Sequence, residues 1–219
     1  MLADTMRVPA AKRGLGDTIS LAAGTYALVA TAAVAVIDLW WGLTHEDYSY
    51  VSDTISDLAA GTNSTVMDAA LKTFAVAVGV VGLALLRWNP GGRAGRGARF
   101  TVGALIVCAL APVVYFIAAY DGYSGEPTGD MTVHLYLVYA LGIGFPVAAW
   151  LTGPGFRTVS GTWRDWSLAI AALWVLAAPW FMVMGTSWDG LYERGLAVLL
   201  LAWFAAAAWN LVRCGRGLV

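Results

Sequence analysis

Side chains whose types and spacing suit chemistry occur at four places in this sequence of 219 residues: 52–57, 68–72, 130–134 and 193–194. An acid four residues before a base shares one helix face with it, so Asp68 can pair with Lys72. By the same spacing Asp130 can orient the ring of His134. We expect the four places to form one polar cluster that binds a ligand. Its predicted members are Ser52, Asp53, Ser56, Asp57, Asp68, Lys72, Asp130, His134, Glu193 and Arg194.

A hydrolase would use the same residue types differently. Ser52 or Ser56 would supply the nucleophile. His134 would be its general base, oriented by Asp57 or Asp130. The sequence has no Gly-x-Ser-x-Gly nucleophile motif, however, and the two serines belong to a repeat that helix geometry explains. We therefore assign no catalytic residue and keep a hydrolase that uses Ser56 and His134 as an alternative.

Few side chains in the sequence could bind a metal. The only histidines are His45 and His134, no H-E-x-x-H motif is present, and the two cysteines, Cys108 and Cys214, lie elsewhere. A zinc site needs several convergent nitrogen or sulfur ligands, whereas a site for Ca²⁺ or Na⁺ lined by carboxylates is chemically easier. We predict no metal site, and the residues do not identify a cofactor.

The composition is that of a protein embedded in lipid. Hydrophobic residues make up 59% of the sequence and charged residues only 12%, and the mean hydropathy is +0.69. An ordinary globular domain carries roughly twice this charged fraction. Several apolar runs of about 20 residues are long enough to cross a bilayer core of roughly 30 Å. The predicted fold is an all-α polytopic membrane protein, with no features that favour nucleic acid as a partner.

The apolar runs between charged or Gly/Pro-rich breaks predict six transmembrane helices. We expect an N-terminal segment, 1–18, a single six-helix domain, 19–212, and a short tail, 213–219. The first run has full span length without a small-residue cleavage site after it, so we expect a retained helix and not a signal peptide. The predicted spans are Ile19–Leu43, Val66–Arg87, Phe100–Tyr120, Thr132–Leu151, Ser167–Trp188 and Leu191–Val212.

Basic residues are distributed unevenly between the two ends of these spans. An even number of spans leaves both termini on one side, and 11 of the 13 Lys and Arg fall there. The positive-inside rule makes that side cytoplasmic, which predicts a prokaryotic cytoplasmic or inner membrane. Ten of the 14 carboxylates lie on or beside the opposite side, where the only bases are Lys72 and Arg194. We expect the Arg194 guanidinium to pair with Asp57 or Glu193.

The external loop after the first span contains a repeat. Val51-Ser-Asp recurs as Ile55-Ser-Asp at a spacing of four residues. In a helix this spacing places Ser52 above Ser56 and Asp53 above Asp57. We expect a short amphipathic helix over Val51–Ala60 that lies on the outer leaflet or against the outer ends of the fourth and sixth spans.

Three short motifs at the outer ends of the spans resemble those of the domain-of-unknown-function 998 family of six-helix bacterial and archaeal membrane proteins. Ser56 and Asp57 match a Ser-Glu-Leu-Gly loop after the first span, with aspartate in place of glutamate and Ala59 in place of glycine. His134 matches a histidine before the fourth span. The Gly-x-x-Glu-Arg motif that begins the sixth span is matched by Gly190, Glu193 and Arg194.

The resemblance covers roughly Ile19–Val212, which is nearly the whole chain. It implies a six-helix fold with a polar site on the outer face, in agreement with the position of the charged residues. The family is distantly similar to the Frag1/DRAM/Sfk1 group of lipid-associated membrane proteins. The resemblance implies no reaction. The site that it implies consists of Ser56, Asp57, His134, Glu193 and Arg194.

Three functions remain open from the sequence. The first is binding of a lipid headgroup, an ion or a small solute at the extracytoplasmic polar cluster, which makes membrane lipids the expected partners. The second is an accessory or structural role in a larger membrane complex, with another membrane protein as partner. The third is a membrane-embedded hydrolase, which a serine–histidine distance within hydrogen-bond reach would favour.

Overall fold

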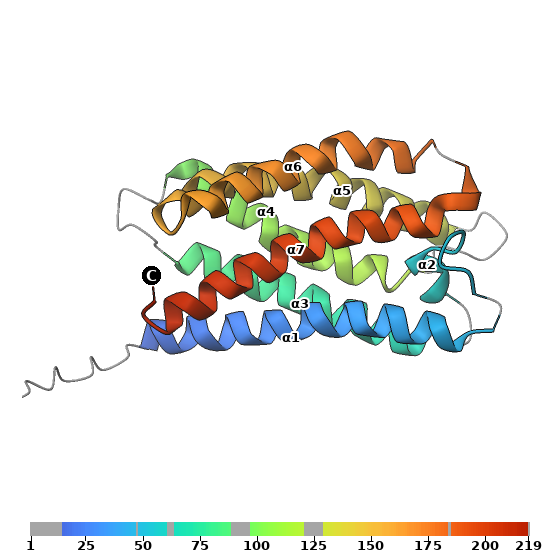
Figure 1. Cartoon of the computed structure of the whole chain (residues 1–219), viewed down its shortest axis with the longest axis horizontal. Helices are drawn as coiled ribbons and strands as arrows, with labels where there is room; N and C mark the ends of the chain where they lie inside the picture. Colours follow the sequence, from blue (N-terminus) through green and yellow to red (C-terminus); the bar gives the residue numbers. More distant parts are fainter. Residues whose placement is uncertain are drawn as a thin grey trace, which may run out of the picture.

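The computed structural model describes residues 15–46, 48–60, 64–88, 97–120, 129–183 and 185–218. This part of the chain is helical and contains no strand, which confirms the all-α prediction. Its long helices run along one common axis (Figure 1). In chain order the elements are α1 (Leu15–Thr44), α2 (Ile55–Leu58), α3 (Thr65–Arg87), α4 (Ala98–Ile117), α5 (Gly129–Thr152), η2 (Gly153–Thr158), α6 (Gly161–Phe181), η3 (Thr186–Trp188) and α7 (Asp189–Gly215).

Five of the described helices, α1, α3, α4, α5 and α7, are long and apolar enough to cross a membrane. These helices make the chain a multi-pass membrane protein. The predicted fifth span, Ser167–Trp188, is not among them. The corresponding helix, α6, begins at Gly161 and ends at Phe181, and it contains four tryptophans, a proline and the ion pair between Arg164 and Asp165. These polar and weakly apolar residues lower its hydropathy, so a sixth span is not confirmed.

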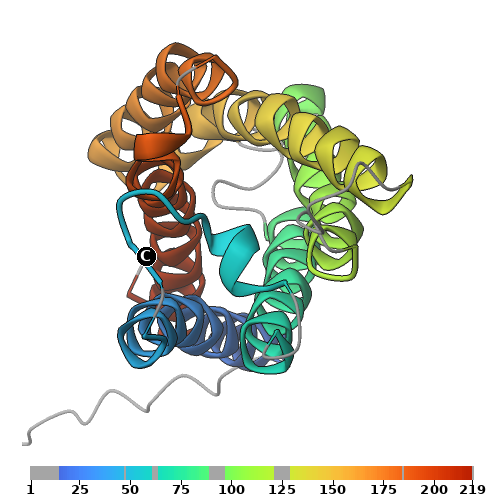
Figure 2. The same ribbon diagram turned by 90° about the vertical axis from the view of Figure 1, so that its right-hand side faces the viewer.

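The six long helices form a ring in which each packs against its neighbours (Figure 2). The order around the ring is α1, α3, α4, α5, α6 and α7, and α7 closes it by packing against α1. The contact between α6 and α7 is the least extensive in the ring. The short helix α2 lies over the middle of the ring at one end (Figure 2). The first and last helices are therefore neighbours, and the ring is weakest next to α6.

The contact between α1 and α7 is close because a glycine faces it. A Cβ atom built at Gly24 would lie 2.5 Å from the carbonyl oxygen of Ala208 and 2.8 Å from the amide nitrogen of Val212. No side chain fits at these distances, so the two backbones approach as glycine permits in membrane helices. This contact holds the start of α1 beside the end of α7 and fixes the register of the two helices.

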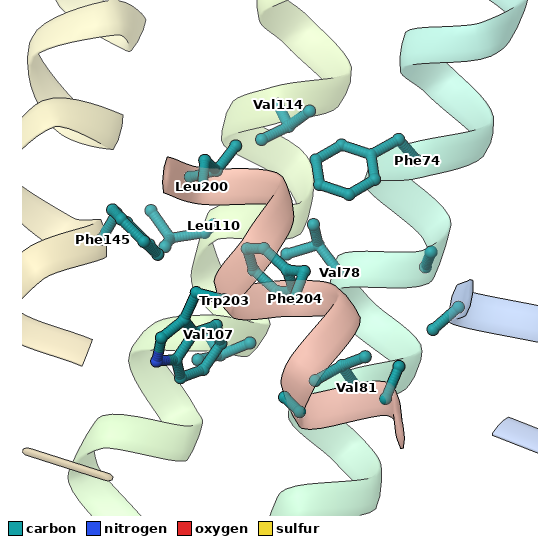
Figure 3. Packing of buried hydrophobic residues seen from close by; sticks show 14 of the residues in the cluster. Phe74, Val78, Val81, Val107, Leu110, Val114, Phe145, Leu200, Trp203 and Phe204 are labelled. Atoms are coloured by element: carbon teal, nitrogen blue, oxygen red, sulfur yellow. The ribbon is translucent and has the colours of Figure 1, made fainter. Parts of the chain in front are cut away.

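A core of aromatic and aliphatic side chains packs between the helices of the ring (Figure 3). Phe204 of α7 packs edge-on against Phe74 of α3, with ring centroids 5.5 Å apart, and it stacks on Phe145 of α5 at 6.4 Å. Beside it the Trp203 indole donates a hydrogen bond of 2.8 Å to Ser167 Oγ of α6. Ser167 in turn donates to the carbonyl of Ala149 at 2.9 Å. The core thus joins α3, α5, α6 and α7 below the end that α2 covers.

Candidate binding site

A cavity of about 780 Å³ lies inside the ring in the half of the bundle nearest α2. Its walls are almost entirely apolar and come from all six long helices and from α2. The cavity exists because glycine, alanine and proline face it from three neighbouring helices, where larger side chains would fill the space. These residues are Gly142 and Pro146 of α5, Ala178 and Pro179 of α6, and Ala197 of α7. Charged side chains occur only at one end, where Asp38, Glu193 and Arg194 line it beside Ser56.

The Arg194 guanidinium organises this polar end. It donates two hydrogen bonds to the Asp38 carboxylate, from Nε at 3.1 Å to Oδ2 and from Nη2 at 2.9 Å to Oδ1. Both side chains are largely buried, with 13% and 12% of their surfaces exposed. A bidentate pair of this kind combines charge with a fixed geometry. The expected partners, Asp57 and Glu193, are wrong: the carboxylate that pairs with Arg194 comes from α1.

The remaining donors of Arg194 bind the loop between α1 and α2 and the first turn of α7. Nη1 donates to the carbonyl oxygens of Asp53 at 2.9 Å, Gly190 at 3.2 Å and Tyr50 at 3.4 Å. Nη2 also donates to the Tyr48 hydroxyl. The guanidinium lies over the rings of Tyr48 and Tyr50, with its carbon 5.4 and 4.7 Å from their centroids, which adds cation–π attraction. One side chain therefore connects α7, α1 and the loop.

The loop lies directly on the start of α7. A Cβ atom at Gly190 would lie 2.1 Å from the carbonyl oxygen of Asp53, so only glycine allows this approach. The Leu191 amide donates to the carbonyl of Val51 at 3.1 Å. Gly190, which begins the Gly-x-x-Glu-Arg motif, thus makes room for the loop that Arg194 of the same motif binds.

The two loop tyrosines complete this network. The Tyr48 hydroxyl donates to the carbonyl oxygens of Thr54 at 2.7 Å and Asp53 at 3.1 Å, and the Tyr50 hydroxyl donates to the carbonyl of Leu39. Burial raises the pKa of Tyr48 to about 12, although the nearby Arg194 acts in the opposite direction. Burial also raises the pKa of Tyr50. Both hydroxyls stay protonated at neutral pH and can keep donating.

The helix expected over Val51–Ala60 is shorter than predicted, since α2 contains only Ile55–Leu58. Thr54 caps it: the Asp57 amide donates to Thr54 Oγ1 at 3.0 Å, and the Thr54 amide donates to Asp57 Oδ2 at 2.6 Å. Before the cap the Asp53 carboxylate accepts from the Ser49 amide at 2.8 Å and closes a turn. Ser and Asp side chains compete with helix formation in this way. The expected alignment of the two repeats on one helix is therefore wrong.

Glu193 of α7 binds the first turn of α2. Its Oε2 accepts a hydrogen bond of 2.6 Å from the Ile55 amide, and its side chain also lines the cavity. Ile55 and Ser56 line the cavity as well, and Leu58 is buried. The short helix therefore caps the cavity. Of the two expected positions, the one against the outer ends of the fourth and sixth predicted spans is confirmed, through His134 of α5 and Glu193 of α7.

Ser56 of α2, which lines the cavity, is in contact with His134 of α5. The distance from Ser56 Oγ to His134 Nε2 is 3.3 Å. His134 Nδ1 lies 2.9 Å from the carbonyl oxygen of Tyr120 and 3.1 Å from that of Ile117. Because both carbonyls only accept, Nδ1 carries the proton of a neutral ring, and Nε2 is free to accept from the serine hydroxyl. The end of α4 thus orients the histidine towards α2.

The other predicted site residues lie apart from this arrangement or outside it. Ser52 donates to its neighbour Asp53 at 2.8 Å and does not line the cavity. Asp68 and Lys72 form the expected pair within α3, 3.2 Å apart. The side chain of Asp130 lies outside the described residues, so its predicted contact with His134 stays a prediction. In the described part of the chain no three His, Cys, Asp or Glu side chains converge as metal ligands would.

Three residues of the site are not in the predicted set: Asp38, Tyr48 and Tyr50. Asp38 is 8% exposed, and it is the only carboxylate within the first predicted span, Ile19–Leu43. A carboxylate at that depth requires a cation, and Arg194 is one of the two bases on the same side of the bundle. The sequence therefore signals that Asp38 needs a cation, but the choice between Lys72 and Arg194 depends on the order of the helices in the ring. The tyrosines carry no comparable signal, because aromatic residues are common at membrane interfaces.

The sequence from residue 27 to residue 210 matches the family described as a protein of unknown function, DUF998. The chain belongs to the DUF998 family. No curated protein and no solved structure matches it. In this DUF998 protein the matched region includes every residue that lines the cavity, and the three DUF998-like motifs meet at the polar end of the cavity.

Proposed function

We propose that the protein binds one amphiphilic molecule, a membrane lipid or a compound of similar shape, in the 780 Å³ cavity. The apolar chain would lie between α5, α6 and α7, and the polar head would lie beside α2. The volume is within the range of small-molecule sites, roughly 300 to 1,000 Å³, and the combination of apolar walls with a few polar groups at one end is typical of them. This combination is the observation that carries the proposal.

The exposed residues of the cavity wall support entry of a ligand from the membrane. Several wall residues also belong to the outer surface of the bundle: Ile143 is 69% exposed, Val198 64% and Val175 58%. They lie on α5, α7 and α6, next to the loosest contact in the ring. An acyl chain could therefore enter sideways from lipid, whereas a water-soluble solute would meet α2 first.

Native mass spectrometry of the protein purified in a mild detergent tests this function. We expect wild type to retain one amphiphile per chain. Ala178→Phe, which projects a ring into the cavity, should abolish retention. The matched control is Ala32→Phe at an exposed position of α1 outside the cavity. Equal retention by both variants, or none by wild type, would contradict the proposal.

We also propose that the termini and the Arg-rich loops face the cytoplasm, which makes the polar end of the cavity extracytoplasmic. The distribution of the 13 bases supports this orientation. Cysteine labelling in 91–97 should require a permeabilised membrane, and labelling in 122–129 should not. The reverse pattern would contradict the orientation.

A second candidate function is acyl-ester hydrolysis, and the Ser56–His134 contact of 3.3 Å favours it. Ser56 Oγ would attack the ester carbonyl while His134 Nε2 takes its proton and passes it to the departing alcohol. Water would then release the acid from the acyl-serine. A fluorophosphonate probe should label wild type and fail to label Ser56→Ala and His134→Ala. Ser52→Ala, the other serine of the repeat, should be labelled like wild type; labelling of Ser56→Ala would exclude this candidate.

A further inference from the structure

We infer that the bound amphiphile carries a positively charged, hydrogen-bond-donating headgroup, such as a primary amine, and that Glu193 recognises it. This inference rests on the proposed binding function and names the class of its ligand. An arginine at the end of an apolar cavity would ordinarily suggest an anionic headgroup, for example a phosphate. The contacts of Arg194 argue against that assignment.

Arg194 has no donor left for a ligand. A guanidinium has five N–H groups. Nε donates to Asp38, Nη2 donates to Asp38 and the Tyr48 hydroxyl, and Nη1 donates to two loop carbonyls and to the carbonyl of Gly190 in α7. Its charge is also matched by that of the Asp38 carboxylate. An anion could bind it only by displacing a buried carboxylate and the loop.

The unused hydrogen-bonding capacity at this end consists of acceptors. Glu193 Oε2 accepts from the Ile55 amide, and in the described part of the chain no donor is bound to its Oε1. Ser56 uses its proton towards His134, which leaves its oxygen lone pairs for the cavity. Both residues line the cavity. A headgroup that fits them must donate hydrogen bonds, and a sulfate or a fully ionised phosphate has no proton to donate.

The charge at this end has the same sign. Among the described residues neither Glu193 nor Asp57 forms an ion pair. The two carboxylates both bind the first turn of α2, at Ile55 and at Thr54, and Asp57 Oδ1 is buried without a partner. Lys72, the other base on this side, is already paired with Asp68. A ligand cation would compensate the two carboxylates, whereas an anion would add to their repulsion.

Two amphiphiles with the same brominated alkyl chain, one ending in a primary amine and one in a sulfate, distinguish these assignments. Bromine quenches nearby tryptophan, and Trp174 lines the cavity. Quenching is measured in a non-ionic detergent for wild type and for Trp174→Phe, and the difference isolates Trp174 from the other tryptophans. We expect half-quenching by the amine at a concentration about tenfold lower than by the sulfate.

Two variants locate the preference. Glu193→Gln keeps an acceptor for the Ile55 amide but removes the charge, and it should abolish the preference for the amine. Asp68→Asn makes the same charge change on the same side outside the cavity, and it should keep the preference. The wild-type comparison stands even if Glu193→Gln does not fold.

The outcomes separate this inference from the function on which it rests. Tighter or equal binding of the sulfate by wild type would overturn the amine assignment and leave the binding function intact. An unchanged preference in folded Glu193→Gln, or an equal loss in Asp68→Asn, would overturn the role of Glu193. Absence of Trp174 quenching by both amphiphiles would overturn the binding function itself.

Discussion

The helix α7 packs in opposite ways on its two sides. Towards α1 it approaches within backbone distance at Gly24, and Arg194 joins it to Asp38 through two hydrogen bonds. Towards α6 the contact is less extensive, and the 780 Å³ cavity lies there. One face of the helix therefore fixes the polar residues in position, whereas the other borders an open cavity. Stability and binding should therefore respond to different substitutions.

The largest effect on stability is expected from Arg194→Ala, on the side of α7 that packs against α1. It leaves the buried Asp38 carboxylate without its cation, which should lower the free energy of unfolding by about 3 to 5 kcal/mol. Arg194→Lys should recover only part of the loss, because an ammonium cannot form the bidentate pair. Thermal unfolding in detergent measures both. Arg213→Ala, at the other end of α7, is the control, and equal small shifts in all three variants would show that Arg194 does not organise the site.

A smaller difference is expected between two Gly→Ala substitutions. At Gly24 the new Cβ would clash with the Ala208 carbonyl, so α1 and α7 must separate, at a cost of about 1 to 3 kcal/mol. At Gly142, on the cavity wall, no atom lies within 4 Å of the Cβ position. Alanine there should be neutral or stabilising by up to about 1 kcal/mol because it favours a helix. Equal melting temperatures would mean that the contact between α1 and α7 is packed no more tightly than the cavity wall.

Filling the cavity should change stability still less. Ala178→Phe places a ring in space that is already open, so we expect the free energy of unfolding to change by less than about 1 kcal/mol. Unfolding by a denaturing detergent, monitored by circular dichroism, measures it. A loss of stability comparable to that of Arg194→Ala would mean that the space beside Ala178 is not open in the folded protein.

The smallest effect concerns the loop between α1 and α2, which Arg194 binds. The pKa of Tyr48 rises from 10.0 to about 12 on folding, so the folded state binds this proton more tightly. Its contribution to stability is complete below pH 10 and is lost as the pH rises towards 12. Tyr48→Phe should flatten the decline of stability over this interval. In a spectroscopic titration wild type and Tyr48→Phe should show the same tyrosinate signal up to about pH 11, and an extra group ionising near pH 10 in wild type would contradict the burial of Tyr48.

Much of the site could be located from the sequence, although its pairings could not. The predicted cluster contains Ser56, His134, Glu193 and Arg194, which the structure brings to one end of the cavity. Charged side chains in apolar helices are restricted to the ends, so their position follows from the hydropathy pattern. The partner of Arg194 lies 156 residues away on α1, and it depends on the order of helices in the ring.

The sequence alone determined that the long helices exist and roughly where along the chain they lie. Apolar runs of sufficient length must form helices in lipid, because no water satisfies their backbone groups. Only the tertiary structure decided that α2 is one turn long, that Asp38 neutralises Arg194, and that a cavity remains beside α6. These features depend on which side chains meet across the ring, and a pattern along one helix does not contain the shape of its neighbours.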